Sequence, residues 1–371
     1  MRAMASLALA GALLSLSVSV DRASGAGGTS EFNHVRLAQQ ALEKHIRPGY
    51  QRLAEAMKGL DAAVSAHCGG DAAGSRRKVD EAFDTVVSAW GGVDHITFGP
   101  VTAEQRTERI MFWPDRRGIG ARQMAKILRE RPVDVLDAKR LAEKSVAVQG
   151  LPALEELLFG GTSGNSAVDE AARFRCRFAS AVASNLATIA RSIADEWSSP
   201  DGFAKLWLDP GHDNPTFLKP EETTMALAKA LDVGLEKVRD QRLAGPLGLT
   251  VQRRKMAPVL GKSRRSMRLI VANIEGLRHL YAEGGLEEAL IDSKSDDPGN
   301  TKNLAQQVGA ELATAEKSAT ELVRAKSPFE GASAQRIIAL GFPLKNARVT
   351  AGELLTSVTN LPLGFNASDG D

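Results

Sequence analysis

The sequence of 371 residues has few aromatic residues, two cysteines and almost no excess of one charge. Aromatic residues make up 5%, which disfavours a β-sheet protein because aromatic side chains favour strands. The formal net charge is +2, so we expect no nucleic acid as the main partner. The one long apolar run is near the N-terminus and is shorter than the roughly 20 residues that cross a bilayer. We therefore expect no permanent membrane span.

The common catalytic signatures are also missing. The sequence contains no HExxH, GxSxG, Walker or GxGxxG motif, and no CxxC pair. Its six histidines are never three or four positions apart, so no two of them share a helix face as a metal clamp. Any metal site must therefore be assembled from distant segments of the chain.

The residues that are present favour helices packed around a substantial core. Hydrophobic residues make up 43% and charged residues 25%, as in ordinary globular proteins. Apolar residues recur at spacings of three and four, which predicts amphipathic helices. These stripes occupy residues 46–64, 79–90, 174–197, 227–238, 267–281 and 304–322. The sequence predicts an all-α fold.

Residues 198–220 interrupt the helical pattern. This segment contains four prolines and separates two sets of predicted helices, as a domain junction does. We expect two packed helical bundles, the first at residues 27–215 and the second at residues 216–371.

The first 26 residues have the pattern of a secretory signal. Arg2 precedes the apolar run at residues 7–20, and small residues follow at positions 23–26. The run is short for a membrane anchor, so we expect export and removal of the signal. The absence of a cysteine near the cleavage region excludes a lipoprotein. In a Gram-negative source the destination would be the periplasm.

Cys68 and Cys176 are the two cysteines. In an oxidising compartment an even number of cysteines favours a disulfide. Closing a loop of 108 positions would stabilise the fold by about 4 to 5 kcal/mol in the chain-entropy view. The alternative is a pair of free, buried thiols.

Two carboxylate sites and one histidine are candidates for ligand binding. Glu155 shares a helix face with apolar residues, and burying it requires a cation, an Arg or backbone donors. His45 lies inside the first amphipathic helix, where it is either a ligand or a hydrogen-bonded structural residue. The C-terminal Asn366, Asp369 and Asp371 supply hard oxygen ligands that suit a cation, although a solvated tail has the same composition.

Several short stretches together resemble the imelysin-like family, which includes the iron-regulated protein A group of bacterial envelope proteins. The stretches are residues 45–50, 98–100, 112–115, 149–155, 175–176 and 364–371. The resemblance implies an all-helical fold of two bundles with a site in the cleft between them. The family's GxHxxE signature is represented by Gly150 and Glu155, but Pro152 stands at the His position. Proline has no nitrogen to offer a metal, so the motif's two-residue clamp cannot form here, which counts against peptidase activity.

The resemblance implies a non-catalytic binding protein linked to iron or haem acquisition. Its cargo would be iron, another divalent cation or haem, and its partner an envelope transport protein. The expected metal ligands are His45 and Glu155. The full set of expected binding residues is His45, Trp113, Asp115, Gly150, Glu155, Asn366, Asp369 and Asp371. Two alternatives are a metallopeptidase with a degenerate metal site and an interaction module anchored by Phe112 and Trp113.

Overall fold

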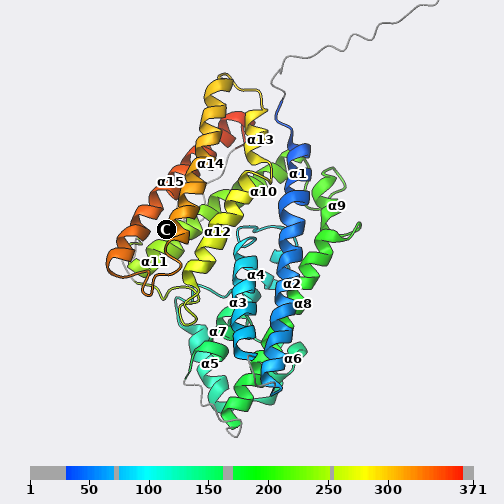
Figure 1. Ribbon diagram of the computed structural model, residues 1–371. Coiled ribbons are helices and arrows are strands. Elements are labelled where there is room, and N and C mark those ends of the chain that lie inside the picture. The colour runs from blue at the N-terminus through cyan, green and yellow to red at the C-terminus, as the bar shows by residue number, and fades with distance from the viewer. Residues whose placement is uncertain (1–30, 71–74, 162–169, 251–254, 362–371) are drawn as a thin grey trace, which may run out of the picture.

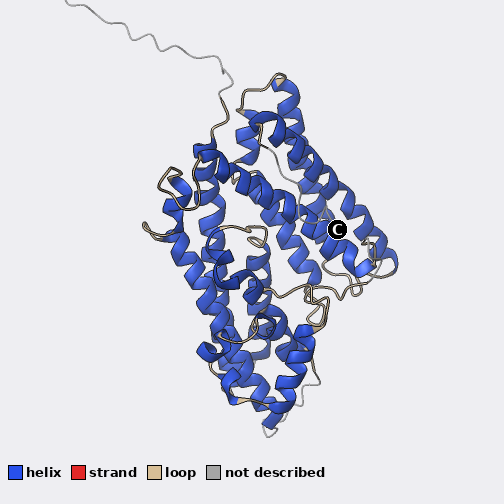
Figure 2. Ribbon diagram, turned by 180° about the vertical axis from the view of Figure 1, so that it is seen from behind, coloured by secondary structure: helices blue, strands red, loops and turns tan. Residues whose placement is uncertain are grey.

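The computed structural model describes residues 31–70, 75–161, 170–250 and 255–361. These ranges form helices joined by loops and contain no β-strand (Figure 2). The N-terminal helices are α1 (His34–Ala41), α2 (Arg47–Cys68), α3 (Ser75–Gly91), α4 (Arg106–Ile110), α5 (Ile119–Glu130), α6 (Ala138–Ala142), α7 (Leu151–Phe159), α8 (Glu170–Ser198) and α9 (Phe203–Leu208). The C-terminal helices are α10 (Pro220–Glu236), α11 (Ala244–Leu247), α12 (Ser266–Tyr281), α13 (Leu286–Ile291), α14 (Pro298–Thr320) and α15 (Gly331–Thr359). The predicted all-α fold is confirmed, while the predicted signal at residues 1–26 lies outside the described residues.

One long helical rod organises the N-terminal half. It comprises α1, a π-helical turn at Leu42–Ile46 and α2, which follow one another along one line (Figure 1). Pro48 lies in the first turn of α2, where its missing N–H breaks the regular α-helical pattern next to the π-helical turn. The apolar stripe predicted at residues 46–64 is buried against α3 and α8.

A disulfide joins the end of this rod to α8. Cys68 is the last residue of α2, and its sulfur is bonded to that of Cys176, with the two Cα atoms 5.4 Å apart. The predicted pairing is therefore confirmed. The bond ties together the two helices that make the most extensive contact in the N-terminal half.

Helix α12 connects the two halves, because it packs against α3 on one side and α14 on the other. Its approach to α3 is very close. A Cβ atom at Gly91 would lie 2.5 Å from the Cβ of Ala272, and one at Gly276 would lie 2.6 Å from the carbonyl oxygen of Gly92. Glycine is required at these two crossing points because any side chain would push the helices apart.

The proline-rich segment after α8 is ordered by its own side chains. The amide of Asn214 donates to the carbonyls of Leu206 and Asp209 at 2.7 and 3.0 Å, and its oxygen accepts from two backbone N–H groups. Trp207 of α9 donates to the carbonyl oxygen of Ala38 at 2.8 Å, which fastens the segment to α1. Buried apolar residues of both halves belong to one connected cluster, and the division at residues 215 and 216 stays a prediction.

None of the described helices has both the length and the hydropathy needed to cross a membrane.

Candidate functional site

The family motif forms the first turn of α7. Gly150 precedes this helix, and a Cβ atom there would lie 2.6 Å from the carbonyl oxygen of Ile110, so only glycine fits. Pro152 occupies the first turn, where a helix can lack an N–H group. Local packing therefore explains Gly150, and helix geometry accommodates Pro152.

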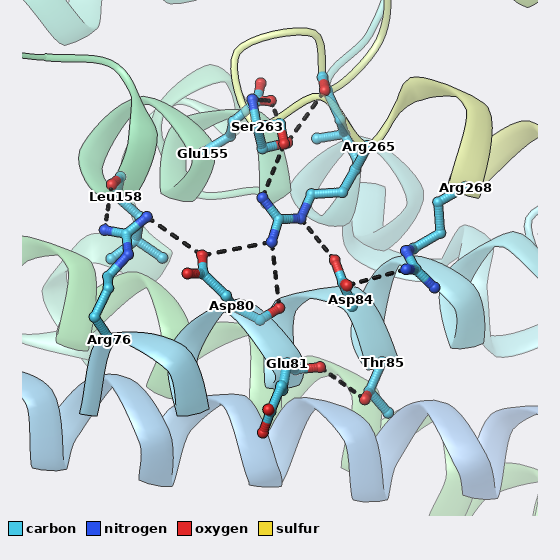
Figure 3. Close-up of polar contacts among 11 residues, drawn as sticks. Arg76, Asp80, Glu81, Asp84, Thr85, Glu155, Leu158, Ser263, Arg265 and Arg268 are labelled. Atoms are coloured by element: carbon cyan, nitrogen blue, oxygen red, sulfur yellow. Dashed lines mark hydrogen bonds and ion pairs between the residues drawn. The ribbon is translucent and has the colours of Figure 1, made fainter. Parts of the chain in front are cut away.

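Glu155 is buried, and its carboxylate is bound by Ser263. One oxygen, Oε1, accepts hydrogen bonds from the backbone N–H and from the hydroxyl of Ser263, each at 2.7 Å (Figure 3). Burial raises the pKa of Glu155, and the hydrogen bonds from Ser263 oppose that effect. Oε1 is therefore bound by protein donors, one of them a backbone N–H, as in one of the alternatives left open by the sequence.

The segment that carries Ser263 is fastened to α3 by ion pairs. Arg265 donates to Asp84 at 2.7 Å and lies 3.4 Å from the carboxylate of Asp80, while Arg268 contacts Asp84 at 3.0 Å (Figure 3). The guanidinium of Arg265 also covers the ring of Phe159 at 4.6 Å from its centroid. This network holds the segment with Ser263 against α3.

A second cluster contains three histidines in a row. His45 is only 1% exposed, and its two ring nitrogens contact two other histidines. Its Nδ1 lies 3.0 Å from Nδ1 of His279, and its Nε2 lies 2.9 Å from Nε2 of His95. We call these three residues the histidine row. The row joins the π-helical turn, the loop after α3 and the last turn of α12, so it lies where the two halves meet.

The histidine row is uncharged at neutral pH. Burial lowers the pKa of His45 well below its usual range, and the neighbouring imidazoles add to the effect. Burial also lowers the pKa of His95 to about 3, and it lowers that of the half-buried His279. Neutral imidazole carries one N–H and one lone pair, which is the form that binds metals.

Beyond His95, a buried ion-pair cluster fixes the loop after α3. Asp94 binds Arg242 and lies 3.3 Å from the ammonium of Lys237, and the amide of Asn273 donates to it at 3.4 Å. Burial disfavours the ionised carboxylate, but the two cations outweigh burial and lower the pKa of Asp94 to about 2. By fixing Asp94, this cluster holds the loop that carries His95 and so helps to position the histidine row.

The structure does not bring the two predicted metal ligands together. Glu155 binds Ser263 just before α12 begins, whereas His45 binds His279 in the last turn of α12. The 16 residues of α12 span about 24 Å. A single ion cannot contact both side chains, so the two expected ligands, whose convergence the sequence left open, do not share one site. In the described ranges, no three His, Cys, Asp or Glu side chains are arranged to hold a metal ion.

The remaining predicted residues have separate surroundings. Asp115 accepts the N–H groups of Ile119 and Ala121 at 2.7 and 3.2 Å, so it caps α5. Trp113 donates to the carbonyl oxygen of Ala257 at 3.4 Å. The C-terminal Asn366, Asp369 and Asp371 lie outside the described residues.

Sequence reasoning found His45 but missed His95 and His279. The two contacts that join them to His45 span 50 and 234 positions of the chain, and no short motif covers such distances. The only signal available was that each histidine lies in or directly beside a predicted amphipathic helix.

Comparison with known proteins agrees with the fold. The family model for imelysin, a peptidase family, matches residues 46–357. An imelysin-like protein from Psychrobacter arcticum 273-4 has a solved structure that superposes with a TM-score of 0.73 at 20% identity, covering 90% of this chain and 97% of that one. A "putative iron-regulated protein A precursor" from Parabacteroides distasonis ATCC 8503 superposes with a TM-score of 0.72 at 12% identity, covering 91% and 97%.

No curated protein matches the sequence. The family model nevertheless spans most of the chain, from the last residue of the π-helical turn to the last helix, and includes His95, His279 and the motif on α7, while His45 lies one residue before the match begins. This chain belongs to the imelysin family.

Proposed function

We propose that this protein is an exported, non-catalytic binding protein that takes part in iron or haem acquisition in the cell envelope. The observation that carries the proposal is the histidine row, in which His279 and His95 contact opposite ring nitrogens of His45 at the boundary of the two halves. Imidazole nitrogen is a good ligand for iron. One structural neighbour is described as a putative iron-regulated protein A precursor, and regulation by iron fits a role in iron supply.

The motif on α7 does not fit a catalytic metal. A zinc hydrolase normally uses about three protein ligands and one open position. At this motif Pro152 offers no donor atom, and the Glu155 oxygen is bound by both donors of Ser263. The described residues supply no convergent set of three ligands to replace them. We therefore derive no hydrolytic step for this chain.

Export to the periplasm is supported by two features. The first 26 residues have the pattern of a cleavable signal. The Cys68–Cys176 disulfide is stable in an oxidising compartment and is rare in the cytosol. A cargo bound in this compartment must be passed on, so the proposal includes an envelope transport partner.

Calorimetric titration of the protein from Gly27 onward tests the proposal, with the disulfide intact. Ferrous iron, ferric citrate, zinc and haem are titrated into the wild type, His45→Ala and Glu155→Ala. We expect one iron species or haem to bind at about one per chain. We expect His45→Ala to weaken binding at least tenfold, or about 1.4 kcal/mol. We expect Glu155→Ala to have little effect, because Glu155 on α7 contacts the segment at the opposite end of α12 from the histidine row.

Two outcomes contradict the proposal. Binding of none of the four ligands by the folded wild type would remove the acquisition role. Loss of binding in Glu155→Ala alone would move the site to the motif on α7. Circular dichroism of each variant shows whether the helical fold is intact.

A further inference from the structure

Helices α2 and α3 form a groove that is open to solvent. Its volume is about 1080 Å³, including the part that is open to solvent. Most of the side chains in its lining are small, so the groove can admit larger apolar side chains from another helix, as in helix-in-groove recognition. The residues that line it, which we call the α2–α3 groove, are Arg52, Glu55, Ala56, Gly59, Ala82, Thr85, Ser88 and Ala89.

Gly59 is the residue of this groove that the packing of the chain does not explain. It lies inside α2, where glycine weakens a helix relative to alanine. A Cβ atom at Gly59 would meet nothing within 4 Å in the described part of the chain, in contrast to the close contacts at Gly91 and Gly276. A glycine at this position does, however, leave room for a side chain that enters the groove from outside.

Helix α15 carries apolar side chains of the complementary shape. Its residues Ile338, Phe342 and Val349 are 39%, 64% and 46% exposed. Spacings of four and seven positions place them on one side of the helix, opposite its buried residues, and the exposed Lys345 and Glu353 lie on the same side. A group of exposed apolar side chains on one surface indicates an interaction site. We call these five residues the α15 ridge.

The groove and the ridge cannot meet within one chain. Helix α15 packs against α14, α14 packs against α12, and α12 packs against α3. Two helices therefore lie between α15 and the groove, and α15 forms an outer edge of the C-terminal half (Figure 1). The two surfaces can make contact only when they belong to different copies of the protein.

The charges on the two surfaces favour one direction of α15 in the groove. With Phe342 placed at Gly59, an α15 that is antiparallel to α2 brings Lys345 beside Glu55, because three positions on one helix match three on the other. In the parallel direction Ile338 would instead lie over Glu55, and Lys345 would lie beyond Gly59. Only the antiparallel direction brings these opposite charges together.

A second pair of charges supports the same direction. Glu353 follows Lys345 by eight positions, or about 12 Å along the helix. The antiparallel arrangement places it opposite Pro48, about 6 Å along the axis from Arg52. The guanidinium of Arg52 already extends in that direction, because its Nη2 lies 3.9 Å from where a Cβ atom on Gly49 would be.

We propose that the protein associates head to tail, with the α15 ridge of one copy bound in the α2–α3 groove of the next. The two copies contribute different surfaces to this contact, and contacts of this type build rings or open chains. One helix and one groove bury a small area, so we expect a reversible association that increases with protein concentration. The inference does not depend on the proposed iron or haem cargo.

Sedimentation velocity over a range of concentrations tests the inference on the protein from Gly27 onward, with the disulfide intact. The wild type is compared with Phe342→Asp, which disrupts the ridge, and with Gly59→Leu, which fills the groove. Val133→Asp is the matched control, because Val133 is 76% exposed and lies outside both surfaces. We expect the wild type and the control to form larger species as the concentration rises, and the other two variants to associate at least tenfold more weakly.

An equimolar mixture of the two variants tests the pairing of ridge and groove directly. Phe342→Asp keeps an intact groove and Gly59→Leu keeps an intact ridge, so one contact can form between them. We expect the mixture to give a dimer and no larger species, with nearly the affinity of the wild type. Lys345→Glu should weaken the association, and the double variant with Glu55→Lys should restore part of it.

Three results would overturn the inference. The first is a wild type that stays monomeric at every concentration, even if a different protein binds it in a way that Gly59→Leu blocks. The second is association that persists unchanged in Phe342→Asp or in Gly59→Leu. The third is a mixture of these two variants that does not dimerise, since ridge and groove would then not bind each other. Circular dichroism and thermal melting of each variant establish that a loss of association is not a loss of fold.

Discussion

The stability of the protein should fall measurably between pH 7 and pH 5 because of His95. This side chain is 3% exposed, and burial lowers its pKa to about 3 in the folded protein. In the unfolded chain a histidine has a pKa of about 6.5. At pH 5 the unfolded state therefore binds a proton that the folded state does not, and stability decreases as the pH falls through the unfolded value.

The size of this effect follows from the two pKa values. At pH 7 the folded and unfolded states differ little in the protons that His95 binds. At pH 5 only the unfolded state binds a proton there, which lowers the free energy of unfolding by about 2 kcal/mol. His45 acts in the same direction, since burial also lowers its pKa. Glu155 acts in the opposite direction, because its folded-state pKa is raised. Asp94, with a pKa of about 2, loses its contribution only below about pH 4.

A substitution isolates the contribution of His95. In His95→Gln the amide can still bond Nε2 of His45, but the side chain no longer titrates. Urea denaturation of both proteins at pH 7 and pH 5 gives four unfolding free energies. We expect the wild type to lose about 2 kcal/mol more than the variant over this interval. An equal loss in both proteins would refute the reasoning that burial keeps His95 neutral.

Three further predictions concern the structural contacts of the site and of the fold. Ser263→Ala removes one of the two donors to the buried Glu155, and we expect a loss of about 1 to 3 kcal/mol in urea denaturation. A much smaller loss than this would mean that solvent reaches the carboxylate; the double variant with Glu155→Gln measures the coupling. Cys68→Ser removes the disulfide and should lower the unfolding free energy by about 2 to 5 kcal/mol, whereas reduction of the variant with dithiothreitol should then have no further effect. Gly150→Ala places a Cβ atom 2.6 Å from a carbonyl oxygen and should cost about 1 to 3 kcal/mol, while Gly59→Ala, where nothing lies within 4 Å, should be neutral or stabilising. Equal melting temperatures for these two glycine variants would contradict the close packing at the motif.

The helices were predictable because their signal is local. Spacings of three and four place residues on one face of a helix, so the stripe at residues 46–64 indicated both the helix and its buried side. The π-helical turn at Leu42–Ile46 was not indicated, although Pro48 marked an irregularity nearby. The disulfide was predictable from the number of cysteines and the expected compartment, and the structure confirms it.

The site was predictable only in part. Glu155 stood out as a carboxylate on an apolar helix face and His45 as a histidine inside an amphipathic helix, and both are buried. Their partners could not be found, because Ser263 is 108 positions from Glu155 and His279 is 234 positions from His45. The sequence left open whether the two residues converge, and the length of α12 separates them into different clusters.

The sequence by itself determined the helical class, the buried face of each long helix and the absence of the motif histidine at Pro152. These properties depend on residues within a few turns of one another or on a single side chain. Only the tertiary structure decided which side chains meet: the three histidines of the row, the Glu155–Ser263 contact and the distance between them. Such contacts depend on how whole helices cross, and that is set by close approaches such as Gly91 against Ala272. Helix periodicity predicts which face of a helix is buried, but it does not predict which helices lie side by side. The contacts of the histidine row therefore depend on the packing of α2, α3 and α12.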